Sequence, residues 1–150
     1  MNGLFARALF AFLALPGVVA FLVPLLLLGF DTTRLSNTWG AIPFGVGIVL
    51  LLACVREFYV AGHGTLAPWA PPTALVMTGL YQWSRNPMYV GVLLILSGWA
   101  IGFHSWPIAL YALVVLVAFH LRIVLHEEPW LARTFGEAWT QYRKRVPRWL

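Results

Sequence analysis

The chain has 150 residues, room for one compact domain, and 61% of them are hydrophobic while only 10% are charged. Soluble globular domains carry about 25% charged residues, so this balance excludes an ordinary soluble protein and indicates an integral membrane protein. The formal net charge of +5 does not point to nucleic acid, because most of the cations flank apolar runs.

Three apolar runs without a charged residue predict the membrane spans: residues 8–30, 39–55 and 87–121. The first is longer than the apolar part of a cleaved signal peptide, so we expect it to be retained. The third would form a helix of about 50 Å, too long for a hydrocarbon core of about 30 Å. The segment GFHSWP at 102–107 can fold it back on itself. About four transmembrane helices are therefore predicted, in an all-α membrane fold.

The positive charges predict the orientation of these spans. If both termini are cytoplasmic, Arg34 is the single cation on the outer side, and the others lie inside. Cys54 lies within the second span and has no second cysteine for an internal disulfide. The sequence carries no sign of oligomeric state beyond Gly45 and Gly47, small residues that allow close helix contact.

Two cytoplasmic segments complete the predicted organisation. The connector over 56–86 is rich in glycine and proline, which disfavours regular helix, and long loops of this kind are commonly functional. From Pro129 onward, apolar residues recur every three to four positions, which predicts an amphipathic C-terminal helix. Gly136 disfavours helix, so we expect close packing or a ligand near that turn.

Ionisable residues stand at the ends of the third and fourth spans. Arg85 precedes the third span, and Glu127 and Glu128 follow the fourth. We expect Arg85 and Arg56 to face the two glutamates, because ionisable groups at membrane depth are functional candidates by default. His120 lies seven residues before Glu127 and therefore on the same helical face. The alternative is that each residue serves only topology, helix capping or packing.

Several familiar chemistries have no motif here. The four histidines lack metal-ligand spacing, so no metal site is predicted. Gly62-His63-Gly64 lacks the third glycine and the strand of a dinucleotide fingerprint, and no serine lies in a nucleophile motif. A polar pocket beneath a loop and open to lipid remains. Such a pocket suits group transfer between a water-soluble cofactor and a membrane-dissolved acceptor.

The C-terminal half, residues 76–150, carries an ordered set of motifs. They are Gly79-Leu80-Tyr81, then RNPMYVG at 85–91, Glu127-Glu128-Pro129, Leu131, Phe135-Gly136, Tyr142 and Val146-Pro147. Together they resemble the signature of the isoprenylcysteine carboxyl methyltransferases and related phospholipid methyltransferases. The connector at 62–68 is similar to that of small bacterial members, and the first two spans match only in hydrophobicity.

This resemblance implies a helical membrane bundle whose cytoplasmic cap binds S-adenosylmethionine, in the inner membrane of a prokaryote. It implies one membrane domain over 1–150, with two spans and the connector in 1–75 and the cofactor-binding hairpin and C-terminal helix in 76–150. The catalytic residues it implies are Arg85, Glu127 and Glu128. The cofactor-binding residues it implies are Tyr81, Asn86, Pro87, Tyr89, His120, Glu128, Phe135 and Tyr142.

Two positions depart from the pattern of the family. Asn86 stands where the family usually has histidine, so no base can act there, and Trp139 stands where the first tyrosine of a final pair is expected. The predicted partner is a membrane lipid or a lipid-like small molecule with a carboxylate, amine or thiol as methyl acceptor. A nicotinamide-dependent membrane reductase and a non-catalytic membrane scaffold stay open as alternatives.

Overall fold

The computed structural model describes residues 13–31, 33, 35–60 and 74–150, and this part of the chain contains helices and no strands. A π-helical stretch at Leu13–Leu22 leads into α2 (Val23–Leu27), and a 3₁₀ turn at Thr38–Gly40 leads into α3 (Ala41–Val60). A second 3₁₀ turn at Gly79–Gln82 precedes α4 (Pro87–Gly102). The chain continues through α5 (Trp106–Arg122), a wide π turn at Ile123–Glu127, and α6 (Glu128–Arg145).

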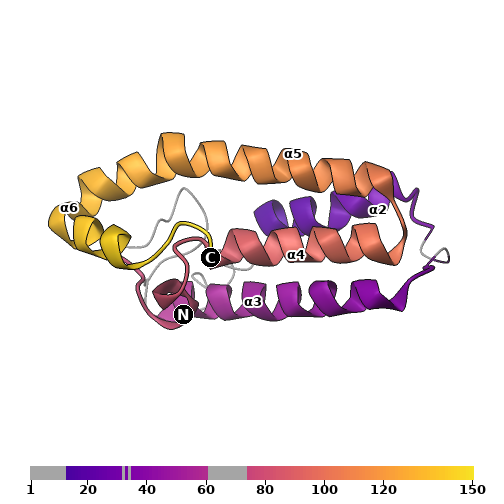
Figure 1. Cartoon of the computed structure of the whole chain (residues 1–150), viewed down its shortest axis with the longest axis horizontal. Coiled ribbons are helices and arrows are strands. Elements are labelled where there is room, and N and C mark those ends of the chain that lie inside the picture. Colours follow the sequence, from indigo (N-terminus) through magenta and orange to yellow (C-terminus); the bar gives the residue numbers. More distant parts are fainter. Residues whose placement is uncertain (1–12, 32, 34, 61–73) are drawn as a thin grey trace.

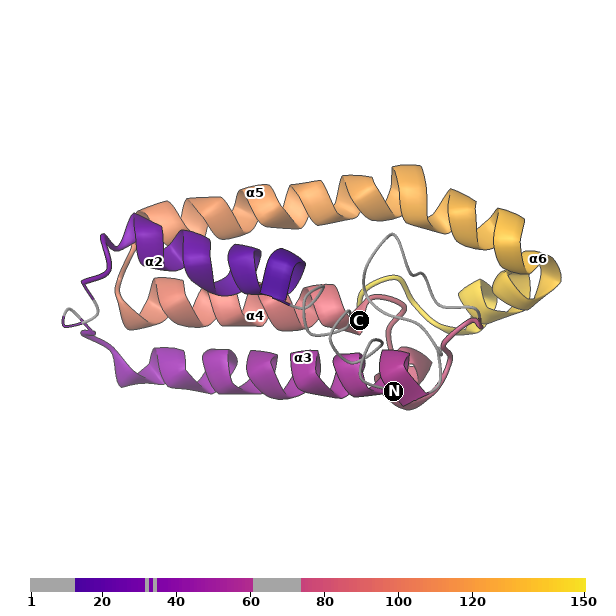
Figure 2. The ribbon, with the colours of Figure 1, turned by 180° about the vertical axis from the view of Figure 1, so that it is seen from behind.

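The long helices lie side by side in one bundle (Figures 1 and 2). Helix α4 lies between α3 and α5, and α2 with the stretch before it packs beside α4 and α5. Helix α6 extends past one end of the bundle, where the chain bends back toward the start of α4. This end of the bundle, formed by α6 and the start of α4, carries a cluster of polar residues.

Two continuous helical stretches are long and apolar enough to cross a membrane: Thr38–Glu57 and Trp106–Arg145. In the most apolar 18-residue segment of each helix, only 22% and 17% is buried within the protein. These helices therefore turn apolar side chains outward, unlike the core helices of a soluble protein. Pro16–Leu27 and Pro87–Gly102 are shorter apolar helices. The predicted all-α membrane fold is confirmed, whereas the count of four spans stays a prediction.

Glycines set the contact between α3 and α4. A Cβ atom added to Gly47 would lie 2.6 Å from the Gly91 carbonyl oxygen, and one added to Gly40 would lie 2.5 Å from the Gly102 nitrogen. These two backbones are therefore in direct contact, in the manner of small-residue interfaces between membrane helices. Gly47 thus serves a contact within the chain, whereas Gly45 has no atom within 4 Å of an added Cβ.

The first helical stretch is held by hydrogen bonds to its backbone. Pro24 has no N–H to donate to a carbonyl of the preceding turn, and the Ala20 carbonyl lies in that turn. Trp99 Nε1 donates to that carbonyl at 3.0 Å, and the Tyr111 hydroxyl donates to the Val19 carbonyl at 3.1 Å. These bonds tie the stretch to α4 and α5, since no water is present in hydrocarbon to satisfy the carbonyls.

The predicted reversal at 102–107 is confirmed, because α4 ends at Gly102 and α5 begins at Trp106. The predicted connector begins later than expected, since α3 runs on to Val60. Residues 61–73 of that connector lie outside the described residues. From 74 the chain is irregular apart from the turn at Gly79–Gln82, which Gly79 opens with a φ of +56°.

The amphipathic C-terminal helix is present, but it does not start afresh at Pro129. It continues α5 through the wide turn, in which the Glu128 N–H donates to the Ile123 carbonyl five residues earlier. Gly136 has φ +49° and ψ −118°, which kinks α6, and an added Cβ would meet nothing within 4 Å. The glycine therefore serves backbone conformation, and the expected close packing is absent, whereas the alternative of a ligand near that turn stays a prediction.

Candidate functional site

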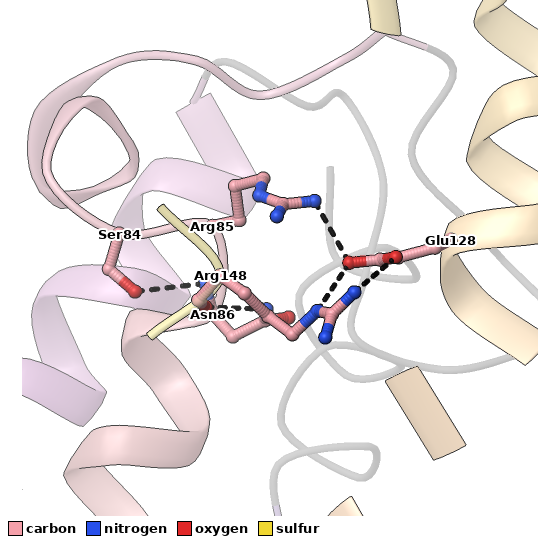
Figure 3. A network of polar contacts seen from close by, with 5 residues as sticks. All are labelled: Ser84, Arg85, Asn86, Glu128 and Arg148. Atoms are coloured by element: carbon pink, nitrogen blue, oxygen red, sulfur yellow. Dashed lines mark hydrogen bonds and ion pairs between the residues drawn. The ribbon is translucent and has the colours of Figure 1, made fainter. Parts of the chain in front are cut away.

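Two arginines converge on the Glu128 carboxylate where the C-terminal segment meets the start of α4 (Figure 3). Arg85 Nη1 donates to Glu128 Oε1 at 2.9 Å. Arg148 donates twice, from Nε to Oε1 at 2.8 Å and from Nη2 to Oε2 at 2.9 Å. The side chains of Arg85 and Glu128 are 12% and 16% exposed, so the ion pair between them is shielded from solvent.

Backbone bonds hold the C-terminal segment against the entrance of α4. The Arg85 N–H donates to the Pro147 carbonyl at 2.9 Å, and Asn86 Nδ2 donates to the Arg148 carbonyl, also at 2.9 Å. Buried Ser84 accepts a hydrogen bond from the Asn86 N–H. Asn86 thus fixes the segment that carries Arg148, a role that needs a donor and no titratable group.

The charges in this cluster stabilise one another. Burial by itself would raise the pKa of Glu128, but the hydrogen bond from Arg148 and the positive charges of Arg85 and Arg148 outweigh it and hold that pKa below its ordinary value. Burial lowers the pKa of Arg85, against the opposing effect of the Glu128 charge. Because a guanidinium does not lose its proton in proteins, Arg85 stays charged at neutral pH. The cluster carries a net charge of +1.

Aromatic residues of α6 form the support beneath Arg85. Trp139 and Tyr142 are buried and pack with Val146, and the centre of the Trp139 ring lies 5.4 Å from Arg85 Cζ, within cation–π range. The Tyr142 hydroxyl donates to the Tyr81 carbonyl at 2.7 Å. The kink in α6 is what brings this half of the helix back to the connector, as Figure 1 shows.

Glu127 belongs to a second cluster. Its Oε1 accepts hydrogen bonds from the Tyr89 hydroxyl and from Arg122 Nε, the latter at 2.8 Å. Arg122 and Glu127 are five residues apart, the spacing that a π turn brings together. The two adjacent glutamates therefore serve different partners, one in each cluster.

The other predicted site residues take distinct positions. Pro87 is the buried first residue of α4, and Tyr81 is buried beside Cys54. His120 is exposed, and its ring stacks on Trp149 with centroids 6.3 Å apart. Phe135 packs against the cluster of Trp139, Tyr142 and Val146.

Arg56 does not join the glutamates of the C-terminal half, although its topology predicts that. It lies 73% exposed and pairs with its neighbour Glu57 at 3.4 Å. Glu57 in turn accepts a hydrogen bond from Thr78 at 2.7 Å, and an added Cβ at Gly79 would lie within 2.8 Å of its carboxyl carbon. Glu57 thus connects the last turns of α3 to the connector.

Arg148 and Arg122 are the residues that sequence reasoning missed. Both count there only as cations on the inner side of the membrane. For Arg122 the five-residue spacing to Glu127 is a signal only if the π turn is foreseen. For Arg148 the neighbouring Val146-Pro147 motif is a signal, because a proline after a helix marks the point where the chain turns back.

Comparisons with known proteins identify the family. The phospholipid methyltransferase family profile matches residues 35–138, more than half of the chain. Protein-S-isoprenylcysteine O-methyltransferase of Schizosaccharomyces pombe is 37% identical over 78 residues, which cover 49% of this chain and 31% of that protein. The enzymes of the same name from Rattus norvegicus and Homo sapiens are each 34% identical, over 114 and 121 residues.

These matches cover unequal shares of the two chains. The rat alignment spans 69% of this chain and 38% of the relative, and the human alignment spans 73% and 40%. The chain thus spans less than half the length of each of these relatives. No solved structure matches. The family profile covers α3, α4, α5 and the kinked start of α6, and the chain therefore belongs to the phospholipid methyltransferase family.

Proposed function

We propose that the protein transfers a methyl group from S-adenosylmethionine to a lipophilic acceptor held in the membrane. The observation that carries the proposal is the meeting of Arg85, from the entrance of α4, with Glu128, the first residue of α6, in one shielded cluster. A non-catalytic scaffold needs no such convergence. Membership of a methyltransferase family favours a transferase over a nicotinamide-dependent reductase.

The residues around the cluster fit this cofactor. Phe135, partly buried against Trp139 and Tyr142, offers aromatic surface to the adenine ring, and the net charge of +1 suits the cofactor's carboxylate. Two buried N–H donors without a partner among the described residues, Arg85 Nε and Trp139 Nε1, mark a place for an acceptor atom of a ligand. When bound, S-adenosylmethionine supplies a methyl group on a positively charged sulfur.

We assign the two glutamates different roles. Glu128 already accepts three hydrogen bonds from two arginines, so it holds Arg85 and Arg148 in place. Both bonds to Glu127 fall on Oε1, which leaves Oε2 to accept another hydrogen bond. Glu127 is then the carboxylate that binds the amine of the cofactor, with Tyr89 and Arg122 as its positioning residues.

The names of the relatives support a carboxylate as the acceptor. Their name states methylation of an oxygen of S-isoprenylcysteine, and a carboxylate oxygen is the one that such a molecule offers. In the transfer, a lone pair of the acceptor oxygen forms the new O–CH₃ bond while the S–CH₃ bond breaks and its electron pair stays on sulfur. The negative carboxylate and the positive sulfonium thereby become a neutral ester and a neutral thioether.

The protein contributes mainly alignment to such a displacement, since no proton needs to move. Holding acceptor and methyl donor in line is worth about 7–11 kcal/mol of barrier in favourable cases. The exposed apolar faces of α3 and α5 keep the site at the level of the bilayer, where a lipophilic acceptor resides. Arg85 is placed to orient an anionic acceptor group from the water side.

The test is a methyl-transfer assay on the full chain in lipid nanodiscs with radiolabelled S-adenosylmethionine. We expect label in a lipid extract or in an added S-isoprenylcysteine, and a fall of at least tenfold in Glu127→Gln and Tyr89→Phe. Glu137→Gln, on the exposed face of α6, is the matched control and should transfer at the wild-type rate. Absence of label in every lipid fraction with folded wild-type protein would refute the proposed function.

A further inference from the structure

Two buried N–H donors beside the Glu128 cluster have no hydrogen-bond partner among the described residues. They are Arg85 Nε and Trp139 Nε1. Trp139 is 2% exposed, and the side chain of Arg85 is 12% exposed, so bulk water does not compensate either donor. Native proteins rarely leave such donors unpaired, so this pair indicates a place for an acceptor atom of a ligand.

The way that Arg85 is bonded shows which ligand atoms suit it. Arg148 donates hydrogen bonds to both oxygens of Glu128 from Nε and Nη2, whereas Arg85 donates to Glu128 from Nη1 alone. The edge of the Arg85 guanidinium that carries Nε is therefore unused. That edge has the fork geometry that binds carboxylates and phosphates with two parallel hydrogen bonds.

Trp139 restricts further which ligand atom can bind here. Its indole N–H can only donate, whereas a tyrosine hydroxyl at this position could donate or accept. The guanidinium of Arg85 lies over the same indole ring, so both free donors belong to one stacked pair. Arg85, Arg148 and Glu128 carry a net charge of +1, and the positive charge of Arg143 also acts on Arg85 and Glu128, so the site favours an anionic ligand.

We propose that Arg85 Nε and Trp139 Nε1 form a subsite for a carboxylate. The inference rests on the proposed function, because two of its reactants carry this group: the methionine part of the cofactor and an S-isoprenylcysteine acceptor. Phosphate fits the same fork, but neither of these reactants carries one. The subsite explains why a buried tryptophan stands beneath the arginine with its N–H unpaired.

The test compares Trp139→Phe, which keeps the ring and removes the N–H, with wild-type full-length protein in detergent. Four probes are titrated: S-adenosylhomocysteine, 5′-methylthioadenosine, an S-isoprenylcysteine and its methyl ester. The first and third carry a carboxylate, and the second and fourth do not. Trp106→Phe, 74% exposed at the far end of α5, is the control.

We expect Trp139→Phe to weaken binding of a carboxylate probe by roughly 10- to 100-fold, the value of a hydrogen bond to a charged group. Binding of the probes without a carboxylate and all binding by Trp106→Phe should be unchanged. A loss confined to S-adenosylhomocysteine places the cofactor's carboxylate in the subsite. A loss confined to S-isoprenylcysteine places the acceptor there.

A second measurement observes the indole N–H of Trp139 directly. In protein with ¹⁵N-labelled tryptophan, the indole N–H resonance that is missing in Trp139→Phe should shift when the carboxylate probe binds and stay in place with its carboxylate-free partner. Equal affinities of wild type and Trp139→Phe for all four probes, or an unmoved indole resonance, would overturn the subsite while the proposed function stands. A folded wild type that does not bind S-adenosylhomocysteine would overturn both.

Discussion

Arg148 holds Glu128, twenty residues earlier in the chain, with two hydrogen bonds of 2.8 and 2.9 Å. Helix α6 bends back on itself and brings the segment after it to the entrance of α4. The two-pronged ion pair between Arg148 and Glu128 joins the end of this segment to the start of α6. Arg85 joins the same carboxylate from the other side. The candidate site is therefore assembled from segments that are far apart in the sequence.

The first prediction concerns this pair. Arg148→Ala should lower the free energy of unfolding by about 1.5–3 kcal/mol, because a charge-assisted hydrogen bond of this kind is lost at a shielded carboxylate. Arg145→Ala is the matched control: Arg145 is exposed, and its Nε reaches only the Gln141 carbonyl at 3.4 Å. Chemical denaturation in detergent, followed by helix circular dichroism, measures both. Equal stabilities of the two variants would contradict the structure of the cluster.

The second prediction is a dependence of stability on pH. The pKa of Glu128 in the folded protein lies below its ordinary value of 4.5, so the unfolded chain takes up a proton at a higher pH than the folded one. The stabilisation is therefore fully present above about pH 4.5 and is lost as the pH falls through the lower folded pKa. Unfolding titrations between pH 7 and pH 3 should show this loss.

Glu128→Gln should remove that part of the pH dependence, because an amide does not titrate in this range. Glu137→Gln, which changes an exposed carboxylate on the same helix, should keep it. An unchanged acid profile in Glu128→Gln would show that other carboxylates cause the acid sensitivity.

The third prediction tests the kink in α6. Gly136 has a φ of +49°, which a side chain disfavours, and there is open space around an added Cβ, so Gly136→Ala isolates the backbone effect. We expect a loss of about 1–3 kcal/mol in the free energy of unfolding. Because the second half of α6 carries Trp139, a straightened helix should also expose that indole, which quenching of tryptophan fluorescence by acrylamide would detect. A variant with wild-type stability and quenching would show that the kink does not depend on glycine.

The fourth prediction compares two glycines of α3. Gly47→Ala places a Cβ 2.6 Å from the Gly91 carbonyl oxygen of α4, so the helices must move apart, at a cost of about 1–3 kcal/mol. Gly45→Ala meets nothing within 4 Å and should be neutral or slightly stabilising. Thermal unfolding of both variants in the same detergent checks the difference. If both changes had equal effects, the close contact between α3 and α4 would be wrong.

Much of the fold is predictable from the sequence because hydrophobicity and turn residues determine it. The runs at 39–55 and 87–121 predict α3, α4 and α5, and the segment at 102–107 predicts the reversal between the last two. The described cations belong to the end of α3, the entrance of α4 and the chain from the end of α5 onward, segments that lie at one end of the bundle in Figure 1; they are Arg56, Arg85, Arg122, Arg133, Arg143, Lys144, Arg145 and Arg148. Such features are local and each has a direct physical cause.

The pairing of charges in the site is less predictable. Sequence spacing brings Arg85 and a glutamate to the same side of the membrane but does not choose between Glu127 and Glu128. The π turn decides, because a single wide turn rotates Glu127 toward Tyr89 and Arg122 and leaves Glu128 for the arginines. Arg56 does not pair with Glu127 or Glu128 for a similarly local reason, since Glu57 is its immediate neighbour and pairs with it.

The central claim is that the cluster around Glu128, with the neighbouring Glu127, binds S-adenosylmethionine. Calorimetric titration of S-adenosylhomocysteine into the detergent-purified full chain tests it most directly, with Glu127→Gln and Glu137→Gln measured alongside. We predict saturable binding by wild type and Glu137→Gln, and at least tenfold weaker binding by Glu127→Gln. Folded wild-type protein that shows no binding at millimolar ligand, or equal binding by all three proteins, would contradict the claim.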